Sequence, residues 1–421
     1  MFKKFILVLS IFCSQLLFAD FNPCEAIISS PVADLTVEPY YKSVKKGLSI
    51  EEFYQMQPFS GSWDACKRAH QLLFNERVTV LDEKGPEVKI KISNFYFFKA
   101  NESIPSDTYW TLKKHVTYIK DIKQKKETLK KIPGPISYKD NDISSQNTAN
   151  VITLKKPFYD PITKEIYSVG TRFVSVEGQN LKGPFRDGYF NSYIFDNTSQ
   201  KIKTTQIPKT HCIRNYSKKP EDQIKNFVQV LRLWSYQKEG AIPYVLGGWS
   251  WTVSCPNDEY EIIKKPEGQY AIQRKKWAHS SKMGFDCMGL IGRAAQVCDI
   301  PFYIKNTTTL LKDLKDLKKG EKIEEGDIIW YPGHVMVISS IKKSLVIEAR
   351  GYERGDGKVQ ENSVESIFEN IKNLDELKSC FLEKKPITVL YADGRPWKTF
   401  KKFKILKFNS IFQKNNSLKG C

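Results

Sequence analysis

The stretch GFDCMGLI at residues 284–291 decides how the second half of this chain folds. It places Cys287 at the start of an apolar run, 288–298, whose small residues are typical of a buried helix. Asp286 directly before the cysteine suits a helix N-cap, and Gly289 suits a helix start that lies close to another backbone. Because the partial positive charge of a helix N-terminus lowers the pKa of a thiol, Cys287 is a candidate nucleophile.

A second stretch, GDIIWYPGHV at residues 326–335, supplies a histidine at the edge of a β-type run. Gly333 leaves the chain before His334 free to turn the imidazole inward. Another β-type run follows at 345–347, and Glu348 stands at its end, where a carboxylate can fix the tautomer of an imidazole. A cysteine at a helix start and a histidine on a strand are the minimal set for cysteine nucleophilic catalysis, with Glu348 as the orienting third member.

Each of these residues also has a structural interpretation. A cysteine in an apolar helix is usually a small core residue, a lone histidine at a strand edge is usually structural, and Asp286 can be a helix cap alone. The surrounding residues favour catalysis, since the apolar stretch 241–248 ends in paired glycines, Gly247 and Gly248, that suit a tight loop beside the cysteine.

These residues resemble the NlpC-type family of papain-like bacterial cell-wall endopeptidases, over about residues 220–395. The nucleophile motif of that family reads roughly D-C-S-G-L and corresponds to residues 286–290, with Met288 in place of the usual serine. Its histidine motif, G-D-L followed by G-H-V, corresponds to 326–328 and 333–335. The methionine removes any substrate contact that the serine hydroxyl makes.

Two further motifs extend the resemblance. The upstream Y-x-W-G-G motif is matched by residues 244–248, with Leu246 in place of the tryptophan. Glu348 precedes an alanine, as the third triad member of the family does, although that member is more often histidine, asparagine or glutamine. The segment that joins the upstream motif to Cys287 is much longer than in the family, and it contains Trp249, Trp251, Cys255, Trp277 and His279.

The resemblance implies an α+β papain-like catalytic domain preceded by all-β SH3-like barrels. It also implies a cysteine hydrolase without a cofactor, which cleaves peptidoglycan stem peptides or murein fragments at the bond between γ-D-glutamate and the following diamino acid. Cys287 would attack the carbonyl, His334 would accept its proton, and Glu348 would orient His334. The Cys287 backbone N–H and the Tyr244 hydroxyl would stabilise the oxyanion, and Asp286 would bind the free amine of the substrate's first residue.

Two alternative functions come from other classes. One is acyl transfer or amide hydrolysis on a substrate other than the wall, since the papain-like fold hosts several cysteine acyl chemistries. The other is a wall-binding protein whose catalytic domain has decayed, although the intact Cys287, His334 and Tyr244 argue against decay. A metal site is not expected, because the sequence has five histidines, no CxxC spacing and no HExxH pattern.

With 421 residues, of which 41% are hydrophobic, the chain should contain two or three domains, each with its own hydrophobic core. A first unit is expected at 24–130, where apolar residues alternate at 76–81 and 88–92 as in half-buried strands, and a helix is expected near 49–56. This unit resembles the bacterial SH3-like module that often precedes such peptidases.

The remaining boundaries follow from composition and periodicity. A polar stretch at 138–147 is interpreted as a linker, and short strands at 150–212 predict a second, smaller SH3-like barrel. The papain-like domain is expected at 215–400 and opens with an amphipathic helix near 224–235. The helix cysteine then precedes the strand histidine, which is the papain-like order.

The N-terminus has the pattern of an export signal at 1–19, with two lysines, an apolar run too short for a permanent anchor, and Ala19 before the expected cleavage. We therefore expect an exported protein, periplasmic or secreted, without a stable membrane anchor. Export permits disulfides, and Cys24 and Cys66 are a candidate pair among the nine cysteines. The net charge of +19 would attract an anionic polymer, but a lysine-biased genome explains it more simply. Because no nucleic-acid motif accompanies the charge, no nucleic-acid partner is expected.

Overall fold

A computed structural model describes residues 21–43, 49–55, 68–98, 106–123, 125–138, 150–176, 188–214, 219–236, 241–252, 260–264, 270–274, 283–351 and 354–414, with 260–264 and 270–274 as backbone only. The expected export signal at 1–19 and nearly all of the expected linker at 138–147 lie outside these ranges. Cys66 and the insertion residues Cys255, Trp277 and His279 also lie outside them. The chain is a mixed α and β protein.

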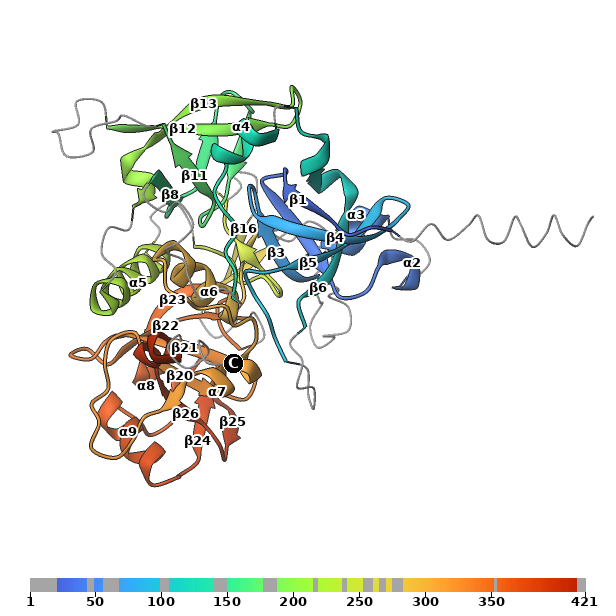
Figure 1. Cartoon of the computed structure of the whole chain (residues 1–421). Helices are drawn as coiled ribbons and strands as arrows, with labels where there is room; N and C mark the ends of the chain where they lie inside the picture. Colours follow the sequence, from blue (N-terminus) through green and yellow to red (C-terminus); the bar gives the residue numbers. More distant parts are fainter. Residues whose placement is uncertain are drawn as a thin grey trace, which may run out of the picture.

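Seven antiparallel strands form the first β unit, in the order β3-β2-β6-β5-β4-β1-β7, of which Figure 1 labels β3, β6, β5, β4 and β1. Val78 and Val80 alternate with half-exposed neighbours along β4, so one side of the strand faces the core, and Gly85 turns the chain into β5 with a φ of +59°. The expected strands at 76–81 and 88–92 are confirmed. The strands are β1 (Cys24–Ile28), β2 (Val32–Thr36), β3 (Arg68–Leu73), β4 (Arg77–Lys84), β5 (Glu87–Ile92), β6 (Thr108–Leu112) and β7 (Val116–Tyr118).

Short helices accompany this sheet. The expected helix near 49–56 is present as α3 (Ile50–Gln55), whose Phe53 and Tyr54 pack with Leu112 of β6 in a small core of their own. The others are α2 (Tyr40–Ser43), η2 (Lys113–His115), η3 (Ile119–Asp121) and α4 (Lys125–Lys130).

A second β unit has five strands in the order β13-β12-β11-β8-β14, around a core that includes Ile152, Phe173 and Ile194. Its elements are β8 (Val151–Leu154), β9 (Phe158–Asp160), β10 (Glu165–Tyr167), β11 (Arg172–Ser175), β12 (Tyr189–Asp196), β13 (Lys201–Pro208), η6 (Lys209–His211) and β14 (Cys212–Ile213). The two β sheets occupy the ranges expected for SH3-like barrels, and the SH3-like assignment itself stays a prediction.

The C-terminal half combines two helices with a six-stranded sheet in the order β19-β26-β20-β21-β22-β23; Figure 1 shows β26, β20, β21, β22 and β23 of this sheet. The expected amphipathic helix is α5 (Pro220–Ser235), and the expected cysteine helix is α6 (Cys287–Val297). The sheet strands are β19 (Lys315–Asp316), β20 (Ile328–Tyr331), β21 (His334–Ser340), β22 (Leu345–Arg350), β23 (Lys358–Ser363) and β26 (Lys404–Lys407).

Strand β21 is buried on both faces, and its side chains alternate between two cores. Val335 and Val337 belong to the core that α5 and α6 cover, while Met336 and Ile338 belong to a second core on the other face. This second core is built with α8 (Val364–Ile367), α9 (Leu374–Leu382), β24 (Ile387–Leu390) and β25 (Pro396–Phe400). The remaining elements are β15 (Trp249–Ser250), β18 (Gly284–Phe285), α7 (Thr307–Asp313), η8 (Phe408–Ser410) and α10 (Ile411–Lys414).

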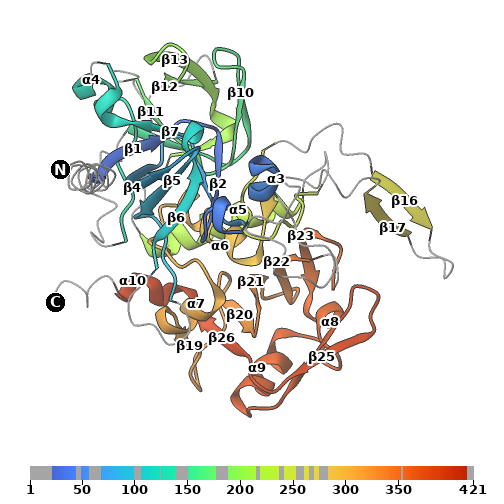
Figure 2. The same ribbon diagram turned by 90° about the vertical axis from the view of Figure 1, so that its right-hand side faces the viewer.

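The long insertion before the cysteine helix contains a hairpin, β16 (Tyr260–Lys264) paired with β17 (Tyr270–Arg274), which projects away from the body of the molecule (Figure 2). Cys24 carries a free thiol in this structure, and its expected partner Cys66 lies outside the described residues. Among the helices described, none is long and apolar enough to cross a bilayer.

Candidate active site

Asp286 fixes the start of the cysteine helix, as the sequence predicts. Its Oδ1 accepts a hydrogen bond of 2.6 Å from the Gly289 N–H, and its Oδ2 accepts one of 3.1 Å from the Gly247 N–H. The Asp286 N–H in turn donates to the Gly248 carbonyl at 3.1 Å. One carboxylate therefore ties the first turn of α6 to the paired-glycine loop and holds Cys287 beside that loop.

The glycines at this junction are required by close backbone contact. A Cβ added to Gly289 would lie 2.0 Å from the Gly248 carbonyl oxygen, and one added to Gly248 would lie 2.5 Å from the Gly284 oxygen. The next residue after the cysteine, Met288, is 3% exposed and packs in the core. The start of α6 therefore contacts the backbone of the loop at 247–248 so closely that only glycine fits at these positions.

His334 and Glu348 come together on neighbouring strands. Gly333 precedes His334 with a φ of +86°, which is a turn conformation that favours glycine, and β21 begins at the histidine itself. Because Val337 pairs with Ile347 in antiparallel register, Glu348 lies near the start of β21. The His334 Nε2 and the Glu348 Oε2 are 2.7 Å apart, and both side chains are buried. The sequence expected Glu348 at the end of its strand, whereas β22 continues to Arg350.

Two residues that the motifs did not indicate complete the surroundings of Glu348. Arg350 donates from Nε at 3.1 Å and from Nη2 at 3.0 Å to Glu348 Oε1, and Asn362 Nδ2 donates to the same oxygen at 3.0 Å. Arg350 is 4% exposed, and its Nη1 donates a hydrogen bond of 2.9 Å to the Leu390 carbonyl. The sequence could have indicated Arg350. A buried carboxylate needs partners, and residues two positions apart on a strand point to the same face of the sheet.

These contacts keep the Glu348 carboxylate ionised. Burial by itself would raise the pKa of Glu348, but the Arg350 guanidinium, the hydrogen bond to His334 and the amide of Asn362 lower that pKa to about 2. The Glu348 side chain is therefore an anion: Arg350 and Asn362 compensate the charge at Oε1, and Oε2 accepts a hydrogen bond from the His334 imidazole.

The Cys287 thiol lies against the strand that carries the histidine. The backbone N–H of Val335, the residue after His334, donates toward the sulfur and lowers its pKa. Burial and the Asp286 carboxylate act more strongly in the opposite direction and raise the pKa of Cys287 to about 12. The expectation that the helix N-terminus makes this thiol acidic is therefore wrong for this structure, in which desolvation dominates.

Tyr244 lies close to the helix start. It forms a parallel bridge with Phe285, its N–H donates to the Gly357 carbonyl at 2.7 Å, and its half-buried ring lies against Gly351. The expected oxyanion role of its hydroxyl stays a prediction, as does the expected amine-binding role of Asp286.

The first β unit contacts the same site. Gln71 Oε1 accepts hydrogen bonds of 2.8 Å from the Trp249 N–H and the Ser250 hydroxyl, directly after the paired glycines. Arg293 on α6 is fully buried, and its Nη1 is 2.9 Å from Glu76 Oε1. The cysteine helix is therefore anchored to the first β unit as well as to its own sheet.

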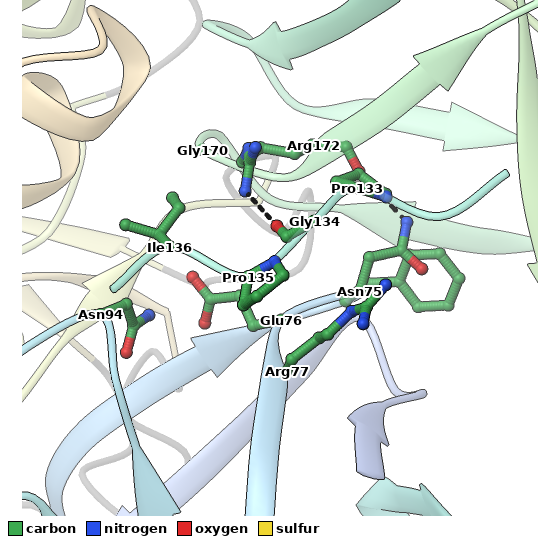
Figure 3. Close-up of a pocket in the computed structure, with 11 residues that line it drawn as sticks. Asn75, Glu76, Arg77, Asn94, Pro133, Gly134, Pro135, Ile136, Gly170 and Arg172 are labelled. Atoms are coloured by element: carbon green, nitrogen blue, oxygen red, sulfur yellow. Dashed lines mark hydrogen bonds between the residues drawn. The ribbon is translucent and has the colours of Figure 1, made fainter. Parts of the chain in front are cut away.

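A hollow between the two β units lies apart from these residues (Figure 3). Arg172 reaches across it and donates from Nη1 to the Gly134 carbonyl at 2.9 Å, and Asn75 donates to the Arg172 carbonyl at 3.1 Å. We interpret this hollow as a structural junction. Among the described residues, no group of three or more histidine, cysteine, aspartate or glutamate side chains is placed to hold a metal ion.

No family model matches the chain, and neither does any curated protein. Solved structures are similar to it. An NlpC/P60 family protein from Bacillus cereus is 14% identical over 81% of this chain and 94% of that chain, with a TM-score of 0.49. NlpC1 from Trichomonas vaginalis is 10% identical over 93% of this chain and 94% of that chain, with a TM-score of 0.29. The peptidoglycan hydrolase RipB from Mycobacterium tuberculosis is 20% identical over 38% and 63%, with a TM-score of 0.23.

Proposed function

We propose that this chain is a cysteine hydrolase that cleaves peptidoglycan stem peptides, with Cys287 as nucleophile. The observation that carries the proposal is the buried 2.7 Å pair of His334 and Glu348 beside a thiol at a helix start. The hydrogen bond of His334 with Glu348, and the backbone N–H of Val335 that donates toward the Cys287 sulfur, support the arrangement of base, orienting group and nucleophile that cysteine acyl chemistry needs.

In the proposed mechanism the thiol transfers its proton as it attacks. Nε2 of His334 is hydrogen-bonded to Glu348, so Nδ1 is the ring nitrogen that accepts this proton. Because the pKa of Cys287 is raised to about 12, the resting thiol is protonated and attack must be coupled to transfer onto the imidazole. The Glu348 anion then stabilises the imidazolium, which returns the proton to the leaving amine before water hydrolyses the thioester.

The oxyanion is proposed to bind at the start of α6. The first N–H groups of a helix have no partner within the helix, so the Cys287 N–H can donate to the oxygen of the attacked carbonyl. The Tyr244 hydroxyl is the second proposed donor, because its backbone bridges to Phe285, two residues before the cysteine.

The proposed scissile bond joins γ-D-glutamate to the following diamino acid, and it rests on the motif resemblance at residues 286–290 and 333–335. The contacts of Gln71 and Glu76 with the catalytic half support a cleft that is walled on one side by the first β unit. A walled cleft suits short, free stem peptides in an exported enzyme better than intact sheets of wall.

A second candidate is a papain-like amidase or acyltransferase on another substrate. Met288 favours it, since this residue is buried in the core where the motif has a serine hydroxyl that could contact a stem peptide. The first candidate is preferred because Asp286, Gly289 and the paired glycines match the motif and hold the start of α6 against the loop at 247–248.

The decisive experiment incubates the purified protein with defined tri- and tetrapeptide stems and identifies the products by mass. Cleavage after the γ-glutamyl residue, absent in Cys287→Ala, supports the proposal. Turnover of simple amides or thioesters without cleavage of any stem supports the second candidate instead.

A further inference from the structure

Tyr331 packs against the imidazole of His334. The two residues are paired across the hairpin of β20 and β21, and their ring centroids lie 5.3 Å apart with an angle of 41° between the ring planes. Tyr331 is 1% exposed and belongs to the second core of the six-stranded sheet. Its ring therefore forms one side of the space that the imidazole occupies.

Phe400, the last residue of β25, supports Tyr331 in turn. The Phe400 ring centroid lies 4.8 Å from that of Tyr331 and 5.6 Å from that of Trp397. The Arg354 guanidinium carbon lies 4.2 Å from the Trp397 ring centroid. Aromatic rings at such separations attract each other in addition to the area that they bury. Two ring contacts thus connect the imidazole to β25.

Glu348 is connected to the same unit from its own side. The Arg350 guanidinium, which binds Glu348 Oε1, also donates from Nη1 to the carbonyl of Leu390, the last residue of β24, at 2.9 Å. Strands β24 and β25 pair in antiparallel register as a sheet of their own. One two-stranded hairpin therefore supports both members of the His334–Glu348 pair, through rings on β25 and through a carbonyl on β24.

The imidazole needs a contact besides its hydrogen bond. Because Glu348 is ionised, Nε2 of His334 carries the proton of the 2.7 Å bond between them. This bond fixes one atom of the ring, whereas the torsion that turns a histidine ring has a broad range of allowed angles. A ring that turns moves Nδ1, the proposed proton acceptor, and a displacement of about 1 Å in such a group can cost about 10²-fold in rate.

We propose that the β24–β25 hairpin positions the His334–Glu348 pair, and that Tyr331 is the positioning residue that limits rotation of the imidazole. This inference rests on the proposed function. Tyr331 acts through His334 by the packing of its ring, and Phe400 transmits the support of the hairpin. A Tyr331 that only filled the core would contribute to stability without changing the state of the imidazole.

The test observes the imidazole directly. In protein labelled with nitrogen-15 at its histidines, the His334 signals are assigned by their loss in His334→Gln. The neutral wild-type imidazole should be a single tautomer with its proton on Nε2, and this proton should exchange slowly with water. Tyr331→Leu keeps an apolar side chain but removes the ring, so it should give mixed tautomers and fast exchange. On a stem peptide, kcat should fall about 10- to 100-fold with KM nearly unchanged.

Three further variants separate positioning from stability. Tyr331→Phe keeps the ring and should restore the wild-type signals. Phe400→Leu should produce a smaller change of the same kind as Tyr331→Leu, and it decides the proposal if Tyr331→Leu does not fold. Phe403→Leu is the matched control, because Phe403 is also 6% exposed in the same core but packs against Phe381, at 5.8 Å between centroids. It should lower the thermal midpoint and leave the His334 signals unchanged.

Each outcome decides the proposal. Wild-type His334 signals in both Tyr331→Leu and Phe400→Leu overturn it, and so does an equal change in Phe403→Leu. A change in Tyr331→Phe as large as in Tyr331→Leu also overturns it, because the hydroxyl would then carry the effect. The spectra need no substrate, so a failure to cleave any stem peptide refutes the proposed function while the His334 signals still decide the role of Tyr331.

Discussion

The His334 Nε2 and the Glu348 Oε2 lie 2.7 Å apart in a buried pair, while the other oxygen of Glu348 is held by Arg350. A neutral amide or imidazole in the third position can orient a histidine without any counter-charge. A glutamate can do so only if its own charge is stabilised, because an isolated buried carboxylate is strongly unfavourable. A buried glutamate at this position therefore requires a cationic partner such as Arg350. Arg350 also determines which oxygen of Glu348 faces the imidazole.

Replacement of Cys287, the proposed nucleophile, should separate catalysis from folding. Cys287→Ala should reduce kcat on a stem peptide by about 10⁴-fold or more, with the thermal midpoint nearly unchanged, because the change removes a single sulfur atom at a helix start. Cys298→Ala is the matched control, since Cys298 is fully buried in the core at the other end of the helix. It should cost about 1 kcal/mol of stability and leave kcat unchanged, and the reverse pattern would reassign the nucleophile.

The proposed role of Glu348 as the third triad member is tested by graded substitution. Glu348→Gln keeps a hydrogen-bond acceptor for His334 but removes the anion that stabilises imidazolium, whereas Glu348→Ala removes both. We expect kcat to fall in the order wild type, glutamine, alanine, with losses of up to about 10⁴-fold for alanine. Single-turnover rates measure this order, and a wild-type rate in Glu348→Ala would remove Glu348 from the site.

Loss of Arg350 should change the pH dependence of stability. In the folded protein the pKa of Glu348 is lowered from 4.5 to about 2, so the ionised carboxylate stabilises the fold above pH 4.5, and this contribution is lost as the pH falls toward 2. Arg350→Met should move this loss to higher pH and cost about 3–5 kcal/mol at pH 7, because a buried charge is left unpaired.

The control for Arg350 is a double variant. Arg350→Met with Glu348→Gln removes both charges and should recover much of the stability lost in the single variant. Urea unfolding at pH 7 and pH 4 measures both effects. An identical pH profile in Arg350→Met and wild type would show that Arg350 does not hold the ionised state of Glu348.

Recognition of a free N-terminal amine by Asp286 can be tested on the substrate. Acetylation removes the positive charge of the amine and adds bulk, so kcat/KM for an acetylated stem should fall at least tenfold, on the order of one charge-assisted hydrogen bond. Asp286→Asn keeps an N-cap acceptor for Gly289 and should lower activity mainly on the free-amine peptide. Equal rates on both peptides, or efficient digestion of cross-linked wall, would contradict a closed cleft.

The ion pair between Glu76 and Arg293 should couple the first β unit to the cysteine helix. Glu76→Gln leaves the fully buried Arg293 without its 2.9 Å carboxylate partner, and removal of one partner of a buried pair costs about 3–5 kcal/mol. Calorimetry should show a lower midpoint with one shared transition. Glu25→Gln, a change on the first strand of the same unit, serves as control and should change the midpoint little.

Local sequence determined the backbone framework around Cys287 and His334. The N-cap at Asp286, the helix that begins at Cys287, the tight glycines and the turn before His334 depend on residues within a few positions of one another, and each prediction is confirmed. Backbone preferences and capping act over one or two turns, so a single sequence can specify them.

Tertiary structure alone decided the electrostatics of the site. The raised pKa of Cys287 and the lowered pKa of Glu348 depend on burial and on charges brought from other elements. Desolvation depends on everything that packs around a group, and the interaction between two charges depends on their distance in space. Neither quantity is contained in the spacing of residues along the chain, and this is why a helix-start cysteine that looks acidic in sequence is protonated in the folded protein.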